Sequence, residues 1–132
     1  MTRYVLDAPT LLEVVARQLP VRPEHQLVAP GAIRSEALAL LLAAVQRGEL
    51  AEEVALEHHE RLTALKMRLL DDRVSRRTAW RIAREQGWTT TRDAAYIAVT
   101  RLQADALVTV DAALAERVAG LVPVAPLRVL SV

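Results

Sequence analysis

The sequence predicts an α/β domain in which a central parallel sheet lies between layers of helices. Two short apolar runs, at residues 4–6 and 107–110, stop at an aspartate, Asp7 and Asp111 respectively. A helical pattern follows each run, and strands that alternate with helices are typical of parallel sheets. Because parallel strands point the same way, the residues that follow them gather on one edge, where such folds bind and react.

Length and composition limit the class of protein. A chain of 132 residues has the size of one domain, so we expect residues 1–132 to share one core. The absence of cysteine excludes disulfides and thiolate zinc sites and agrees with a reducing compartment. The longest apolar run, residues 37–45, is far shorter than the roughly 20 residues of a membrane helix. A carboxylate at Asp7 interrupts any signal-peptide pattern, and these features together predict a cytoplasmic protein without a membrane segment.

The first half of the chain predicts two strands and three helices. Residues 3–6 form a strand, and Thr10-Leu11-Leu12-Glu13 matches a capping box that starts a helix reaching about residue 18. With Thr10 as the cap, Asp7 is not needed in that role. A short strand at 27–29 ends at Pro30-Gly31, and helices follow at 32–46 and 50–65. The second of these carries an apolar stripe made of Ala51, Val54, Ala55, Leu62 and Leu65.

The second half predicts three further helices and two strands. One helix covers residues 72–86 and stops at Gly87, and another opens at Thr90-Thr91 and reaches residue 103. The strand 107–110 and a short helix at 112–118 come next. A last strand at 122–125 contains Pro123, which places it on an edge of the sheet or outside it.

Glu36 is the most informative acidic residue. On a helix, its neighbours three and four positions away are Ala32, Ile33, Ala39, Leu40 and Ala43, so we expect its carboxylate on a buried face. A buried carboxylate is costly unless it is protonated, paired or bound to a metal ion. Pairing with a buried arginine, or a boundary position near the helix start, is the structural alternative.

Three other polar residues have both a functional and a structural interpretation. Asp93 belongs to a second capping box, Thr90-Thr91-Arg92-Asp93, and Asp111 is placed to cap the helix that follows it. Thr109 points to the same side of its strand as Asp111, where it would support a carboxylate or serve as an ordinary strand residue. Taken together, Asp7, Glu36, Asp93 and Asp111 are an all-oxygen set suited to Mg²⁺ or Mn²⁺.

Positive charge is concentrated in one segment. The formal net charge of +1 is too small for the whole surface to attract a polyanion, so such binding requires a local patch. The segment 73–84 carries no acidic residue and surrounds Trp80 with five arginines: Arg73, Arg76, Arg77, Arg81 and Arg84. This patch would bind phosphate or an acidic partner segment, or else it is a solvated face whose arginine stems cover Trp80.

Four motifs in order carry a family resemblance. They are the strand ending at Asp7, the Ser35-Glu36 pair after Pro30, the helix Thr91-Arg92-Asp93-Ala94-Ala95-Tyr96-Ile97-Ala98, and Leu107-Val108-Thr109-Val110-Asp111. Over nearly the whole chain this order resembles PIN-domain ribonucleases, in particular the VapC toxins of prokaryotic toxin–antitoxin pairs. The family commonly has a serine or asparagine two residues after the first aspartate. This chain has Pro9 there, and Thr10 is the candidate replacement although capping competes for its hydroxyl.

The resemblance implies a PIN-like three-layer sandwich that acts as a metal-dependent endoribonuclease toxin. It implies that Asp7, Glu36, Asp93 and Asp111 hold Mg²⁺ or Mn²⁺ and that Thr109 supports them. It also implies a homodimer and a cognate antitoxin, a segment of which wraps a groove formed by the early helices, with the helix 50–65 as one wall.

Three other functions stay open at this stage. The chain could be a catalytically silent PIN-like module that acts by protein–protein binding. It could be a doubly wound nucleotide or phospho-acceptor domain, although the lysine usual near the last strand is missing and the only lysine is Lys66. It could also cleave DNA in place of RNA.

Overall fold

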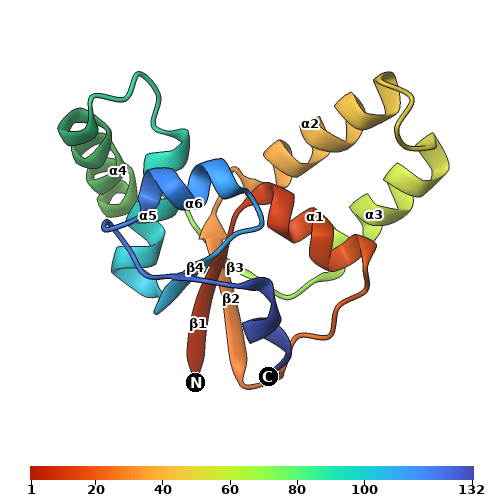
Figure 1. Ribbon diagram of the computed structural model, residues 1–132, viewed down its shortest axis with the longest axis horizontal. Coiled ribbons are helices and arrows are strands. Elements are labelled where there is room, and N and C mark those ends of the chain that lie inside the picture. The colour runs from red at the N-terminus through yellow and green to blue at the C-terminus, as the bar shows by residue number, and fades with distance from the viewer.

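The computed structural model describes residues 1–132 and contains one five-stranded sheet (Figure 1). All neighbouring strands are parallel, in the order β3-β2-β1-β4-β5. The strands are β1 (Thr2–Leu6), β2 (His25–Pro30), β3 (Arg68–Leu70), β4 (Ala106–Val108) and β5 (Val124–Ala125). The predicted parallel sheet is therefore confirmed, with β1 at its centre.

Helices cover the sheet from two sides. They are α1 (Ala8–Ala16), α2 (Ile33–Gln46), α3 (Glu52–Ala64), α4 (Arg73–Gln86), α5 (Arg92–Gln103) and α6 (Ala112–Val118), and a 3₁₀ helix covers Leu127–Ser131. Helix α1 packs with α2 and α3, whereas α5 packs on β1, β2 and β4 and is covered by α4. Figure 1 shows α1, α2 and α3 on one side of the strands and α4 and α5 on the other, which confirms the predicted three-layer α/β sandwich. None of these helices is both long enough and apolar enough to span a membrane.

The order of the strands defines where a ligand site belongs. From β1 the chain moves outward through β2 to β3, then returns to the other side of β1 as β4 and continues to β5. The direction of winding therefore reverses between β1 and β4. Open α/β sheets bind ligands beside the carboxyl ends of the strands at such a switch point. Asp7 directly follows β1, and Thr109 directly follows β4.

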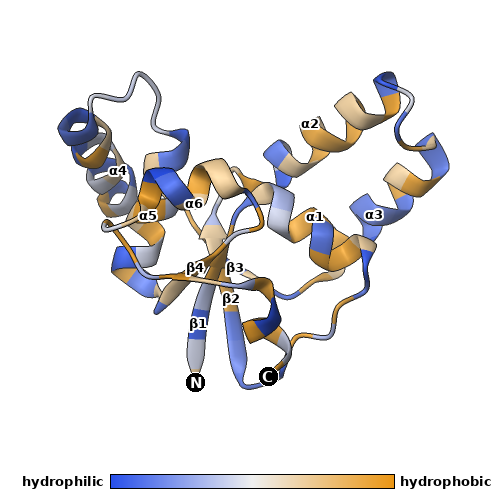
Figure 2. Ribbon diagram, viewed as in Figure 1, coloured by the Kyte–Doolittle hydropathy of each residue, from blue (hydrophilic) through white to orange (hydrophobic).

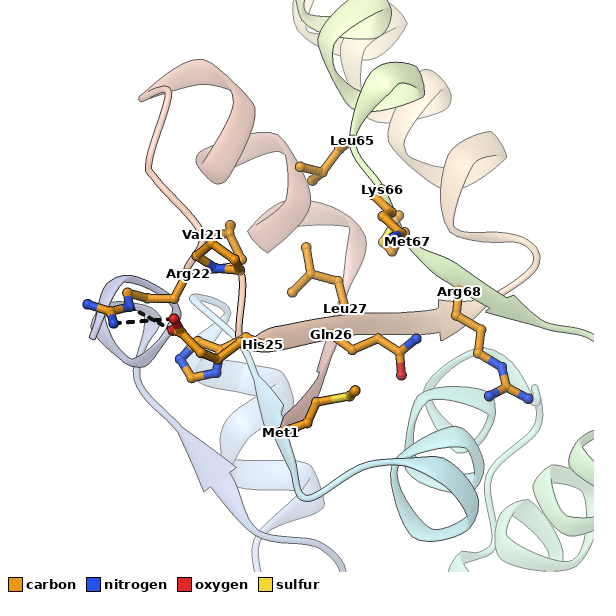
Figure 3. Close-up of a pocket in the computed structure, with 12 residues that line it drawn as sticks. Met1, Val21, Arg22, His25, Gln26, Leu27, Leu65, Lys66, Met67 and Arg68 are labelled. Atoms are coloured by element: carbon orange, nitrogen blue, oxygen red, sulfur yellow. Dashed lines mark hydrogen bonds and ion pairs between the residues drawn. The ribbon is translucent and has the colours of Figure 1, made fainter.

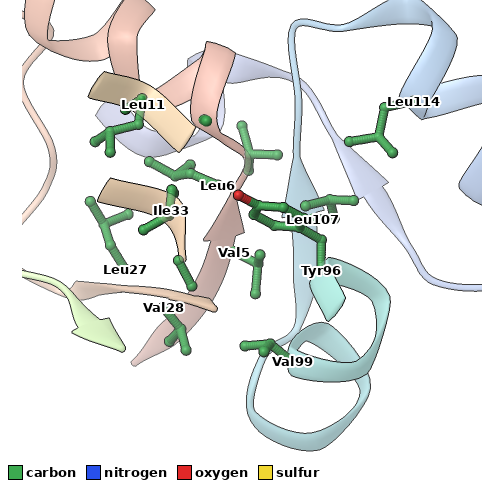
Figure 4. Packing of buried hydrophobic residues seen from close by; sticks show 14 of the residues in the cluster. Val5, Leu6, Leu11, Leu27, Val28, Ile33, Tyr96, Val99, Leu107 and Leu114 are labelled. Atoms are coloured by element: carbon green, nitrogen blue, oxygen red, sulfur yellow. The ribbon is translucent and has the colours of Figure 1, made fainter. Parts of the chain in front are cut away.

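The core forms where the central strands meet α5. Val5, Leu6, Leu107 and Val108 are all fully buried, as expected for strands covered on both faces. Figure 4 shows the ring of Tyr96, from α5, among these strand residues, with its hydroxyl oxygen directed toward the end of β1 at Leu6. The polar tip of a core side chain is thus placed at the edge of the sheet that carries Asp7.

The predicted capping box at Thr10 is wrong. Helix α1 begins two residues earlier, at Ala8, and Asp7 is its N-cap, with a side chain that accepts a hydrogen bond from the Thr10 amide. Pro9 lies in the first helical turn, where a missing N–H costs nothing because that group has no intrahelical partner. Pro9 is therefore part of the helix.

Other boundaries also differ from the sequence prediction. Strand β3 was not predicted, because Arg68–Leu70 is only three residues long and lies at an edge of the sheet. The strand predicted at 107–110 ends at Val108. Helix α5 starts at Arg92 with Thr91 as N-cap and no side-chain cap bond, so the second capping box is also wrong. The stop of α4 at Gly87 is confirmed, since this residue adopts the left-handed conformation that glycine tolerates.

Helices α2 and α3 form a hairpin that projects from the sheet (Figure 1). Of the predicted stripe on α3 only Ala55 and Leu62 are fully buried, while Val54 is exposed. Several large apolar side chains of the hairpin face solvent: Leu38, Leu40 and Leu42 on α2 and Leu56 on α3. Figure 2 shows hydrophobic colours along α2 where it stands clear of the sheet. The hairpin is thus anchored by few residues.

We predict that Leu62→Ala lowers the free energy of unfolding by about 2–5 kcal/mol, because a fully buried leucine is replaced by a cavity. Leu56→Ala is the matched control on the same helix. Its side chain is 56% exposed, and we expect a change within about 0.5 kcal/mol. Urea denaturation of both variants tests this, and equal losses would show that α3 is not anchored through Leu62.

Candidate functional site

Asp7 is the buried centre of the candidate site. Only 3% of its surface is exposed, and its Oδ1 accepts hydrogen bonds from the Thr10 amide at 3.3 Å and from the Thr10 hydroxyl. Its Oδ2 accepts a hydrogen bond from the Thr109 hydroxyl at 2.8 Å. Burial raises the pKa of the Asp7 carboxyl above its ordinary range, and the hydroxyl bonds oppose that rise. Both oxygens are therefore held in fixed directions.

The two threonines connect Asp7 to the segment that follows β4. The Thr10 hydroxyl oxygen also accepts a hydrogen bond from the Val110 amide at 2.9 Å. The Thr109 hydroxyl oxygen accepts one from the Asp111 amide at 3.0 Å. Because each hydroxyl donates to Asp7 and accepts from this segment, the ends of β1 and β4 are joined by side-chain bonds at the switch point.

Glu36 lies in the first turn of α2 and meets Tyr96 of α5. The Tyr96 hydroxyl donates a hydrogen bond to Glu36 Oε2 at 2.8 Å. Desolvation by burial raises the pKa of Glu36, the bond from Tyr96 and the charge of Arg92 oppose the rise, and the charges of Asp93 and Asp7 add to it. Burial and the charge of Glu36 in turn raise the pKa of Tyr96. Electrostatically, Asp7, Glu36 and Asp93 thus form one group.

The prediction that Glu36 lies on a buried helical face is wrong for most of that face. Helix α2 turns Ile33, Ala37 and Leu41 toward the core, whereas Ala39 and Leu40 are exposed. Glu36 itself is half-buried, at the boundary between the buried face and solvent. The hairpin leaves the sheet at this point, so an apolar helical face does not become a buried one.

Asp93 is half-buried at the start of α5 and forms an ion pair with Arg117 of α6. The Arg117 guanidinium also lies 5.8 Å from the centre of the Trp88 ring, a cation–π contact. Asp111 takes the structural role considered for it, since its Oδ1 accepts hydrogen bonds from the amides of Ala113 and Leu114. Its Oδ2 makes no hydrogen bond in the chain.

The four predicted carboxylates come from four different places in the chain, after β1, in the first turns of α2 and α5, and before α6, and they do not enclose an ion. No group of three or more acidic or histidine side chains lies close enough to hold a metal ion. The donor chemistry nevertheless fits a hard divalent cation, because the set offers only oxygen atoms and the charges of Asp93 and Asp7 raise the pKa of Glu36. Arg117 is the cation that contacts this set.

Two contributing residues were not predicted as part of the site. Tyr96 was recognised only as part of a helical motif, and Arg117 carried no signal at all. Only the tertiary contacts of Tyr96 and Arg117 place them beside Glu36 and Asp93. Thr10 was named both as a helix cap and as the candidate replacement for the family's serine or asparagine, and its hydroxyl donates a hydrogen bond to Asp7.

The predicted arginine patch lies on the outer face of α4. All five arginines are exposed there: Arg73, Arg76, Arg77, Arg81 and Arg84. Only Arg76 has an acidic partner, Asp71 at 3.3 Å. Trp80 is 67% exposed, so the arginine stems do not cover it as the structural alternative required.

A hollow of about 540 Å³ lies at the opposite edge of the sheet (Figure 3). Its lining includes Leu27, near the start of β2, and Lys66 and Met67, which lead into β3. These residues precede the strands or begin them, whereas Asp7 and Thr109 follow the strands. The hollow is therefore separate from the carboxylate site.

Two solved structures share this fold. The crystal structure of PAE2754 from Pyrobaculum aerophilum has a TM-score of 0.71 and 22% identity, over 98% of this chain and 93% of that chain. The structure of VapBC-1 from nontypeable Haemophilus influenzae has a TM-score of 0.60 and 17% identity, over 95% and 98%. No family model matches the chain, and no curated protein matches it in sequence. The chain has the VapC-type PIN-domain fold that its motifs predicted.

We predict that Glu36→Gln raises the free energy of unfolding at pH 7 without added metal. Its raised pKa means that the native state binds more protons than the unfolded chain, so stability falls as pH rises through this window. Glutamine removes the charge and still accepts the hydrogen bond from Tyr96. The gain should shrink as pH falls below about 4.3, where the unfolded carboxyl is also protonated.

Chemical denaturation at pH 7 and at acid pH measures this effect. Glu60→Gln is the matched control, because Glu60 is exposed and unpaired and should change stability by no more than about 0.5 kcal/mol. A Glu36→Gln variant that is less stable than wild type at pH 7 would show that Glu36 serves the fold as a charged partner.

Proposed function

We propose that this chain is a metal-dependent endoribonuclease and the toxin of a type II toxin–antitoxin pair, acting in the cytoplasm. The observation that carries the proposal is the buried Asp7 carboxylate, which two threonine hydroxyls orient at the switch point of a PIN-like sheet. Glu36 and Asp93 are electrostatically coupled to each other at that place. Such a cluster costs stability, which supports a functional reason for keeping it.

Asp7, Glu36, Asp93 and Asp111 are the residues that would hold Mg²⁺ or Mn²⁺. A divalent cation bound there lowers the pKa of a water molecule and neutralises charge on the phosphate. Thr109 and Thr10 fix the direction of the Asp7 oxygens, and Tyr96 fixes one oxygen of Glu36. Arg117 neutralises Asp93 in the structure described and would be displaced from it, toward a phosphate, by a competing cation.

Protein partners belong to the same proposal. The solved structure of VapBC-1 shares the fold, and we expect a cognate antitoxin and a second copy of this chain as partners. The exposed leucines of the α2–α3 hairpin support a protein contact, because Leu38 and Leu42 lie one turn apart on α2 and exposed apolar side chains of this kind are typical of interaction sites.

A catalytically silent PIN-like module is the second candidate function. It is favoured by the absence of three acidic or histidine side chains close enough to share one ion and by the same exposed leucines. Such a module would bind its protein partner without cleaving RNA. The metal dependence of RNA cleavage separates the two candidates.

We predict that the purified chain cleaves RNA with Mg²⁺ or Mn²⁺ and loses this activity in excess chelator, because all the candidate ligands are oxygen donors. Asp7→Asn should reduce cleavage by about 100-fold or more, and Glu60→Gln should leave it unchanged. The measurement is gel analysis of structured RNAs. Cleavage that persists in chelator would exclude the metal assignment, and cleavage of DNA alone would exclude a ribonuclease.

We further predict that Thr109→Val lowers cleavage about 10–100-fold, because Asp7 Oδ2 loses the hydroxyl that orients it. Thr109→Ser keeps the hydroxyl and should restore most of the activity. Initial cleavage rates over a range of Mn²⁺ concentrations test this, since a misdirected ligand raises the Mn²⁺ concentration that is required. If valine and serine variants behave alike, Thr109 has no role in positioning Asp7.

A further inference from the structure

Three adjoining hollows run from the carboxylate site to the outer face of α4. The first, about 310 Å³, is lined by Asp93 and Arg117 together with Trp88, Thr89 and Thr90. The second, about 420 Å³, shares Trp88 and both threonines with the first and extends to Trp80 and Arg84. The third, about 260 Å³, is lined by Arg77, Trp80, Arg81 and Arg84. Because each hollow shares lining residues with the next, the three lie in a row, which we call the path.

The charge along this path changes from an ion pair at the inner end to unpaired arginines at the outer end. Its inner end is at the Asp93–Arg117 ion pair, beside the carboxylates. Its outer end carries Arg77, Arg81 and Arg84, none of which has an acidic partner, and no acidic residue lines the two outer hollows. Figure 2 shows the hydrophilic colouring of α4, which lies on the far side of α5 from the sheet. An anionic chain that leaves the carboxylates would therefore find unpaired cations along this path.

Aromatic groups accompany the charges. Trp80 and Trp88 are the only tryptophans in the chain, and both line the path. Arg117 lies over the Trp88 ring, and Trp88 is half-buried, whereas Trp80 stands exposed among the arginines. Trp80 is therefore the ring available for stacking. An unpaired nucleotide base can stack its face on such a ring, whereas a base inside a duplex is already stacked on its neighbours.

We propose that this path binds single-stranded RNA that leads into the carboxylate site, with a base stacked on Trp80 and phosphates bound by Arg77, Arg81 and Arg84. The arginine fork suits phosphate geometry, and stacking tolerates any base. The assignment of the RNA as substrate rests on the proposed function, whereas the binding itself does not. Two isolated tryptophans do not make a general single-strand binder, so the path serves to position an RNA for the site.

The experiment measures the binding of a fluorescein-labelled 12-nucleotide oligouridine by anisotropy, with the full chain and excess EDTA to prevent cleavage. Trp80→Ala should weaken binding about 10-fold, and Trp80→Phe, which keeps a ring, should bind nearly as wild type does. The double variant Arg77→Gln/Arg81→Gln should reduce the slope of log Kd against log salt concentration by about 1.4, since two phosphate contacts are lost. The matched control is Arg128→Gln, an exposed arginine without an acidic partner on the 3₁₀ helix.

Intrinsic fluorescence gives a second readout, because both tryptophans lie on the path. Oligouridine should quench the wild-type emission, and most of the quenching should disappear in Trp80→Phe while affinity is kept. All the substituted side chains are exposed, so the thermal midpoints of the variants should match that of wild type.

Several results would overturn the path. One is an unchanged affinity for oligouridine in Trp80→Ala, and another is equal binding of a 12-base-pair RNA duplex. A third is competition by polyglutamate as strong as that by oligouridine, because it would indicate a surface for an acidic protein segment. Different results would exclude the proposed RNA path and the proposed nuclease function. Metal-dependent cleavage that is unaffected by Trp80→Ala would exclude the path alone, and Trp80-dependent RNA binding without cleavage in Mn²⁺ would exclude the nuclease and support the path.

Discussion

The bonds between Asp7 and the two threonine hydroxyls are the interaction on which the arrangement of this site depends. Asp7 directly follows β1, caps α1 and is buried, so its carboxylate needs partners. Thr10 provides one from the same corner and Thr109 provides the other from the end of β4. A single side chain thereby joins the two strands between which the winding of the sheet reverses.

This arrangement places negatively charged side chains in buried positions, where their charge lowers the stability of the fold. Burial raises the pKa of both Asp7 and Glu36, and the charges of Asp7 and Asp93 raise that of Glu36 further. Tyr96 and Arg117 offset part of the cost by a hydrogen bond and an ion pair. A protein selected for stability alone would place apolar or neutral side chains here, so the retained carboxylates follow the pattern found at many functional sites.

The small net charge of the chain conceals a separation of charge between two regions. Asp7, Glu36 and Asp93 influence one another electrostatically in one region, and unpaired arginines lie on α4, with Trp88 and Arg117 between the two. The proposed nuclease would require both regions, because cations attract a polyanion while oxygen donors suit the divalent cation that would act on it. The three neighbouring hollows lead from Asp93 and Arg117 to the arginines of α4.

The sequence by itself determined the fold class, the helices and the edge of the sheet at which Asp7 and Thr109 follow their strands, because these follow from local periodicity and from the common direction of parallel strands. It did not determine the caps or the edge strand β3, since Asp7 competed with Thr10 for one helix start and three residues carry little pattern. Only the tertiary structure decided that Tyr96 meets Glu36 and that Arg117 meets Asp93. These contacts join residues 60 and 24 positions apart in the chain, and no local pattern of the sequence pairs residues at such separations.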